Sequence, residues 1–157
     1  MKLNATVISA YIFKWPSHHL LEMHEFTIAQ GIVDFLRETY STKGYRITSF
    51  KIAIGELSMF DRNIIIDLVR ELIKSTELED AKFTVSIEEA AIKCGTCNQI
   101  HTFKELTKSL SNEEKEMIHF IPELISSYAR CPSCGSRDLK ILTGRGVMVT
   151  DIAVQRE

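Results

Sequence analysis

The sequence predicts an α+β protein in which two helices pack on a small, mainly three-stranded sheet that carries an inserted, zinc-ribbon-like domain with four cysteines. Before residue 92 the hydrophobic pattern alternates between helix, strand, helix and strand, an order that places two helices on one sheet. Residues 92–145 then hold all the cysteines as two C-x-x-C pairs. A last apolar strand follows them, so the cysteine-bearing segment is expected to interrupt the sheet domain.

The amino-acid composition disfavours several classes of function. The chain has 157 residues, of which 45% are hydrophobic and 25% charged, as is typical of globular proteins. A net charge of −2 and scattered Lys and Arg disfavour nucleic-acid binding through phosphate contacts. No apolar run is long enough for a membrane span, and the N-terminus lacks a signal-peptide cleavage pattern. We therefore expect a cytoplasmic protein without nucleic-acid or membrane partners.

Two amphipathic helices are expected. The first begins near Phe26, carries a broad apolar stripe as far as Tyr40 and ends near Ser41. The second follows Asp61, which is a suitable N-cap. Its expected apolar stripe is Ile64, Ile65, Leu68, Leu72 and Ile73.

Three strands are expected to form the main sheet. The stretch 45–57 is rich in β-branched residues, with one irregularity, and is closed by Gly55. In the stretch 81–90, apolar and polar residues alternate, with Phe83, Val85 and Ile87 on one face. The last strand, VMVTDIAV, breaks strict alternation, which indicates a bulge near Thr150.

The two cysteine pairs carry the clearest chemical signal. Cys94 with Cys97, and Cys131 with Cys134, have the spacing of paired metal-binding turns that together supply four thiolates. Gly95 and Gly135 are expected to let backbone amides approach the sulfurs. A structural zinc site is the leading interpretation, with an iron site and redox-active pairs as alternatives. Four thiolates leave no open coordination position, so such a site would support structure rather than catalysis.

The segment between the cysteine pairs is longer than a simple ribbon requires. It spans 33 residues between Cys97 and Cys131. Ser111 and Glu114 have capping-box spacing, which predicts a short helix. Pro122 ends this helix and suits the start of another turn.

Met23, His24 and Glu25 stand at the head of the first helix. If Met23 were the first residue, its amine, the His24 amide and the His24 ring could form fused chelate rings, which suit Ni(II) or Cu(II). With residues 1–22 attached, the amine becomes an amide and this chelate is lost. A histidine that merely neighbours a helix cap is the alternative.

The stretch MHEFTIAQGIVDFLRE, the IGELS turn, the two C-x-x-C pairs and the closing GRGVMVTDIAV together resemble the HypA family of nickel metallochaperones, from Met23 to the end. The resemblance implies a nickel-binding domain of residues 23–91 plus 146–157, with Met23, His24 and Glu25 at its site. It implies a zinc-binding domain of residues 92–145. His119 matches a further nickel ligand, or is a half-buried histidine at a helix end.

The resemblance also implies a function and partners. The protein would hold Ni(II) transiently and deliver it to the precursor of the [NiFe]-hydrogenase large subunit, together with a HypB-type NTPase. No catalytic grouping, phosphate loop or HExxH motif is visible, so no enzyme is expected. A zinc-ribbon binding module of a nucleic-acid or transcription complex is the alternative.

The extension of residues 1–22 departs from the family pattern. Either translation starts at Met23, or this member has lost the amine ligand. His18 and His19 could bind metal, although adjacent loop histidines are usually solvated. A homodimer is compatible with an N-terminal extension and an open sheet edge, because both can exchange between copies.

Overall fold

The computed structural model describes residues 6–8, 25–58 and 60–156, and the chain forms two compact units. The first unit comprises Met1–Ala53, Phe60–Ser86 and Val147–Glu157. The second comprises Ile54–Met59 and Ile87–Gly146. The extension predicted at residues 1–22 lies outside the described residues except for residues 6–8. The functional domain boundaries expected at residues 92 and 145 stay predictions.

Helix α1 (Glu25–Thr39) provides much of the first unit's core. Its spacing of apolar residues buries one face, as the sequence predicted. The buried residues are Ile28, Ala29, Ile32, Val33 and Leu36. Phe26 departs from the predicted stripe, because it lies in the first turn and is 54% exposed.

Helix α2 (Arg62–Ile73) begins where the sequence predicted. The Asp61 carboxylate accepts hydrogen bonds from the amides of Asn63 and Ile64, at 2.8 and 3.0 Å. These bonds satisfy amides that have no partner within the helix. The expected stripe needs one correction: Ile64 is 46% exposed, whereas Val69 is buried. The buried face therefore follows the i, i+4 spacing of Ile65, Val69 and Ile73.

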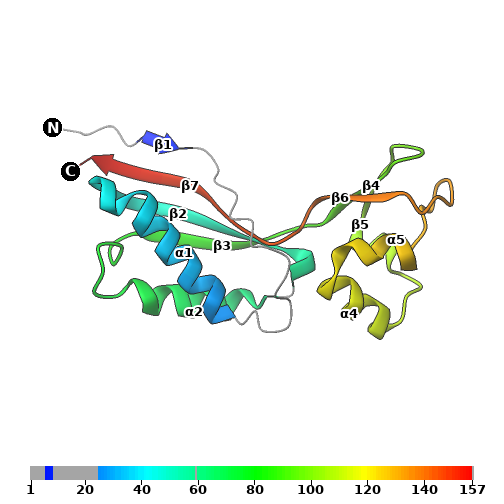
Figure 1. The fold of residues 1–157 in the computed structure, drawn as a ribbon, viewed down its shortest axis with the longest axis horizontal. Helices are drawn as coiled ribbons and strands as arrows, with labels where there is room; N and C mark the ends of the chain where they lie inside the picture. The colour runs from blue at the N-terminus through cyan, green and yellow to red at the C-terminus, as the bar shows by residue number, and fades with distance from the viewer. Residues whose placement is uncertain (1–5, 9–24, 59, 157) are drawn as a thin grey trace. The chain divides into compact units, whose positions relative to one another are not determined.

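The first unit's sheet contains β1 (Thr6–Ile8), β2 (Tyr45–Gly55), β3 (Lys82–Glu88) and β7 (Val147–Arg156). Its strand order is β1-β7-β2-β3, so a short fourth strand joins the three that were predicted. β1 pairs antiparallel with β7, with Val7 opposite Ala153. The helices α1 and α2 pack together on one side of this sheet (Figure 1).

Strand β7 has its irregularity close to the predicted position. Asp151 has a positive φ of 49°, and the burial alternation shifts there by one residue. Because of this shift, Val149 and Ile152 are both buried although they are three residues apart. The bulge therefore lets the whole strand keep its apolar side chains in the core.

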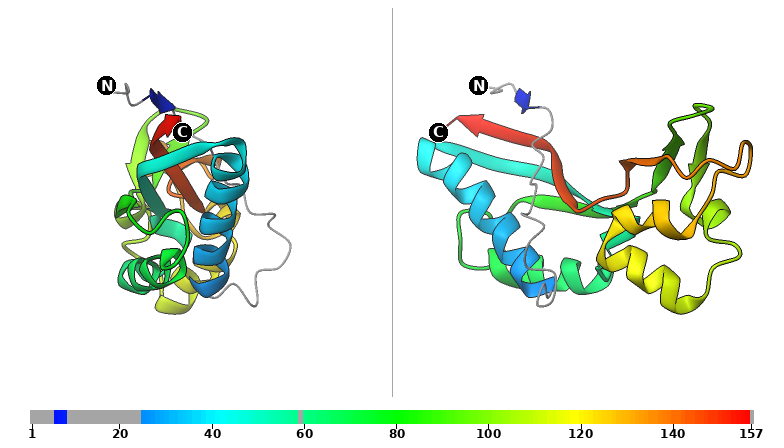
Figure 2. Two further views of the ribbon diagram at one scale, coloured as in Figure 1. Left: turned by 90° about the vertical axis from the view of Figure 1, so that its left-hand side faces the viewer. Right: turned by 45° about the vertical axis from the view of Figure 1, so that its right-hand side comes forward.

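The second unit is built on a three-stranded antiparallel sheet. Its strands are β4 (Ala91–Cys94), β5 (Ile100–Thr102) and β6 (Leu139–Thr143), in the order β5-β4-β6. The short α3 (Phe103–Leu106), α4 (Asn112–Phe120) and α5 (Ile125–Tyr128) follow β5 along the chain (Figure 2). The predicted capping box opens α4, where Ser111 and Glu114 bond each other's backbone amides. Ile92, Ile118 and Ile125 are fully buried at the centre of this unit's core.

The turn η2 (Glu56–Ser58) belongs to the second unit and is held by backbone hydrogen bonds. The amide of Gly55 donates to Gly146 O at 2.7 Å, and the amide of Leu57 donates to Gly144 O at 2.9 Å. Gly144 has a φ of +96°, and a Cβ there would lie 2.5 Å from Ala90 Cα. Only glycine satisfies both the conformation and this close approach.

A search of the described helices for membrane spans finds none that has the length and apolarity required.

Candidate metal centre

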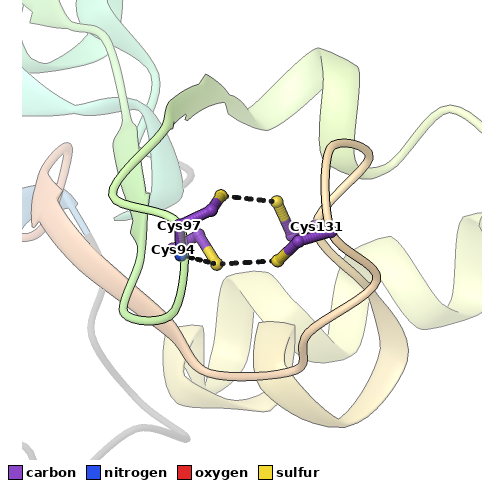
Figure 3. A group of neighbouring side chains, drawn as sticks. Cys94, Cys97 and Cys131 are labelled. Carbon is purple, nitrogen blue, oxygen red and sulfur yellow. Dashed lines mark hydrogen bonds between the residues drawn. The ribbon is translucent and has the colours of Figure 1, made fainter.

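The four cysteines lie on two turns with matching hydrogen bonds. In the first, the amide of Cys94 donates to Gln99 O and the amide of Asn98 donates to Cys94 O. In the second, the amide of Cys131 donates to Ser136 O and the amide of Gly135 donates to Cys131 O. Two similar turns therefore present two sulfurs each, and the sulfurs face one another (Figure 3).

The predicted role of Gly95 and Gly135 in the approach of amides to the sulfurs stays a prediction, and the two glycines differ in conformation and surroundings. Gly135 has a φ of 76°, which glycine adopts without strain. The equivalent left-handed residue in the first turn is Asn98, with a φ of 64°, and not Gly95. Gly95 is instead needed for space, because a Cβ there would meet the Asp138 carboxylate at 2.0 Å.

The sulfur positions fit a tetrahedral zinc ion. All four ligand atoms lie within 4.8 Å of one another. The Cys94–Cys134 and Cys97–Cys131 sulfur pairs are each 3.6 Å apart. A tetrahedron with Zn–S bonds of about 2.3 Å has sulfurs roughly 3.8 Å apart. The four-cysteine cluster thus has the donor type, number and spacing of a structural zinc site.

The surroundings of the second cysteine pair shift the pKa values of Cys131 and Cys134 in opposite directions. Burial opposes ionisation of Cys131, but the backbone amides of Cys134 and Ser133 and the His101 ring lower its pKa to about 6. For Cys134, the Ser136 amide favours the thiolate, yet burial and the neighbouring sulfurs raise its pKa to about 12. A thiol must lose its proton to bind zinc, so zinc binding is coupled to proton release.

His101 is a residue that the sequence analysis missed. It is 9% exposed, and its Nε2 lies 3.3 Å from the Cys131 sulfur. The available signal was its place on a strand close behind Cys97, between the outward-facing Ile100 and Thr102.

His119, predicted as a nickel ligand, lies half-buried near the end of α4. Its Nδ1 is 3.3 Å from the Leu57 carbonyl oxygen, and its ring lies 5.3 Å from that of Phe103. A carbonyl only accepts hydrogen bonds, so Nδ1 carries the proton. This tautomer leaves the lone pair on Nε2, the nitrogen that a metal would bind.

The predicted head of α1 is described only in part. Met23 and His24 lie outside the described residues. Glu25 begins α1, and its carboxylate accepts a hydrogen bond from the Asp61 amide at 3.3 Å. The Glu25 side chain therefore joins the first turn of α1 to the N-cap of α2. Glu25 and His119 belong to different units.

The fold and the cysteine cluster together describe a small α+β protein in which one unit places four cysteine sulfurs close enough to hold one metal ion. Comparison with known proteins gives the family. Residues 23–154 match the family described as "Hydrogenase/urease nickel incorporation, metallochaperone, hypA". The chain belongs to this HypA family, whose members are metallochaperones rather than enzymes.

Individual relatives agree with this membership. The hydrogenase maturation factor HypA of Pyrococcus furiosus is 34% identical over 136 residues, which cover 86% of this chain and 98% of the relative. HypA of Thermococcus sibiricus is 36% identical over 137 residues, covering 85% and 97%. The solution structure of the Ni metallochaperone HypA from Helicobacter pylori covers 86% of this chain and all of its own, with a TM-score of 0.53 and 17% identity. That likeness concerns the fold.

Proposed function

We propose that this protein binds Ni(II) through the head of α1 and delivers it to the precursor of the [NiFe]-hydrogenase large subunit. The observation that carries the proposal is the family match, which begins at the Met-His-Glu head and extends through both cysteine turns. The likeness to the same family also supports a division of the chain into a nickel-binding and a zinc-binding domain. Residues 23–91 plus 146–157 would bind nickel, and residues 92–145 would bind zinc.

Each ligand has a proposed role. Cys94, Cys97, Cys131 and Cys134 hold a structural zinc ion. His24 supplies an imidazole to nickel, and Met23 supplies its amine when it is the first residue. The structure gives the Glu25 side chain a hydrogen bond to the Asp61 amide. Glu25 therefore contributes to nickel through its backbone nitrogen, while its side chain orients the helix start. His119 offers the lone pair on its Nε2.

The proposed setting is the cytoplasm, with a HypB-type NTPase and the hydrogenase precursor as partners. Nickel is cargo, so its binding must be weaker and more readily reversed than that of zinc. A nitrogen-donor site for nickel and a thiolate tetrahedron for zinc separate the two metals by geometry.

The test is a calorimetric titration of Ni(II) into two zinc-loaded forms of the chain, residues 1–157 and residues 23–157, each with and without His24→Ala. We expect His24→Ala to abolish nickel binding in the form that starts at Met23. A form with both His18→Ala and His19→Ala in the 1–157 chain is the matched control and should bind as its parent does. Equal binding with and without His24 would overturn the assignment.

A further inference from the structure

His101 points into the core of the second unit at the level of the metal centre. His101 lies on β5 and pairs with Ile92 of β4. Ile92 itself precedes Cys94 by two residues on the same strand. Its strand neighbours Ile100 and Thr102 are exposed, whereas His101 is 9% exposed. Strand alternation therefore directs a polar ring inward, where a polar group needs a hydrogen-bonding partner.

The partner of this ring is a cysteine sulfur. His101 Nε2 lies 3.3 Å from the sulfur of Cys131, a residue that is only 2% exposed. A metal-bound thiolate has lone pairs but no hydrogen. The hydrogen in this contact must therefore belong to Nε2, which makes His101 the donor and Cys131 the acceptor.

The other side of the ring faces a carboxylate that is itself held in place. Glu105 Oε2 lies 3.5 Å from His101 Nδ1. The same oxygen accepts from the Thr102 amide at 3.0 Å, and the Glu105 amide donates to Thr102 Oγ1 at 3.2 Å. This reciprocal cap opens α3, so the carboxylate position is fixed by the backbone.

We propose that His101 is a positioning residue of the metal centre, which donates a hydrogen bond to the Cys131 sulfur and thereby slows the loss of zinc. The inference rests on the proposed zinc site. Four thiolates and one Zn²⁺ carry a formal charge of −2, and burying that charge without donors is unfavourable. A donated hydrogen bond draws charge from Cys131 and stabilises the bound state.

The experiment compares the full chain with its His101→Phe and His101→Gln variants. Phe keeps a planar ring without a donor, whereas Gln retains an amide N–H. Zinc release to an excess of a chromophoric chelator gives the rate, and the sulfur-to-metal charge-transfer band of the Co(II)-substituted protein reports the electron density on sulfur. Ile100→Ala, on the exposed face of the same strand, is the matched control.

We expect His101→Phe to bind zinc about 10-fold more weakly, the lower end of the range for loss of a group that hydrogen-bonds a metal ligand, and to release it correspondingly faster. The cobalt charge-transfer band should shift to lower energy in the same variant, since a thiolate without a donor is more easily oxidised. His101→Gln should fall between the wild type and His101→Phe, and Ile100→Ala should match the wild type.

Unchanged release and an unchanged cobalt band in His101→Phe would overturn the inference and leave His101 as a packing residue. If that variant does not fold, His101→Gln decides, because an amide donor must still shift the band relative to the imidazole. A Cys131→Ser variant separates the two hypotheses. Zinc content and release equal to those of the wild type in Cys131→Ser would overturn the zinc assignment itself, and this inference with it.

Discussion

At the scale of single residues, Gly144 is a position of the second unit where the backbone conformation and the close packing both favour glycine. Gly144 combines a left-handed φ with a close approach to Ala90, and its carbonyl accepts the hydrogen bond of Leu57. Leu57 O in turn receives the His119 ring. A glycine conformation is thereby connected, through two hydrogen bonds, to the position of a proposed nickel ligand.

Replacing Gly144 should therefore destabilise the protein more than replacing a glycine in open space. We expect Gly144→Ala to lower the free energy of unfolding by about 2–4 kcal/mol, from backbone strain together with steric overlap. Gly44→Ala is the matched control, since Gly44 also has a positive φ but no atom within 4 Å of an added Cβ. It should cost about 1–2 kcal/mol. Urea denaturation measures both, and equal costs would contradict the steric argument.

The pKa values of Cys131 and Cys134 predict how many protons zinc binding releases. At pH 7 the Cys131 thiol, with a pKa of about 6, is mostly ionised, whereas Cys134, with a pKa of about 12, is protonated. Zinc binding at pH 7 should therefore release fewer than four protons from the four cysteines.

Below pH 6 the number of released protons should rise, and zinc affinity should fall more steeply, because Cys131 then also binds a proton that zinc must displace. Calorimetric titrations in buffers of different ionisation enthalpy measure the proton count. Release of four protons at pH 7 would show that the Cys131 pKa is not lowered.

At the scale of elements, helix caps connect the sequence to the sites. Asp61 caps α2, and its own amide donates to the Glu25 carboxylate in α1. The start of α2 therefore determines how the first turn of α1 is held, and this turn follows directly after Met23 and His24. In the second unit, Ser111 is the N-cap of α4, the helix that carries His119.

Asp61→Ala should remove two hydrogen bonds to helix amides while its own backbone amide remains. We expect a loss of about 1 kcal/mol in the free energy of unfolding. Asp61→Asn, which keeps a side-chain acceptor, is the control and should lower the free energy of unfolding by only about 0.3 kcal/mol. Chemical denaturation of both variants checks the difference, and a neutral Asp61→Ala would mean that water replaces the cap fully.

At the scale of the whole molecule, each unit has its own source of stability. The first unit buries apolar faces of α1, α2, β2 and β7 against one another. The second unit has a smaller core, to which Cys94 and Cys131 themselves contribute. Small cores commonly need a metal or a disulfide, and the cysteines of this unit are free thiols.

Zinc removal should therefore destabilise the second unit selectively, so that its backbone opens more often although its folded state remains populated. After treatment with a chelator under reducing conditions, we expect amide hydrogens of β4, β5 and β6 to lose protection against exchange. Those of α1 and β2 within the first unit should retain it. Hydrogen exchange with mass spectrometry measures this, with zinc added back as the control. Equal loss in both units, or in neither, would contradict independent cores.

Local sequence patterns predicted the helices and the three longest strands of the first unit, helix α4, the two cysteine pairs and the family, but they did not predict β1, β4, β5 or α3. Periodicity of apolar residues, cap residues such as Asp61 and Ser111, and C-x-x-C spacing are local signals, so they can be recognised without a fold. Local periodicity also misassigned a few residues. Phe26 and Ile64 lie in the first turns of their helices and are exposed, although their spacing places them on the predicted apolar stripes.

Contacts between groups far apart in the chain depend on the tertiary fold. His101 reaches Cys131 across 30 positions of the chain, and His119 meets Leu57 across 62. The tertiary fold also placed the left-handed residue of the first cysteine turn at Asn98 and made Gly144 indispensable beside Ala90. These contacts depend on how strands pair and how helices dock, and no local pattern of residues encodes the distance between two side chains far apart in the chain.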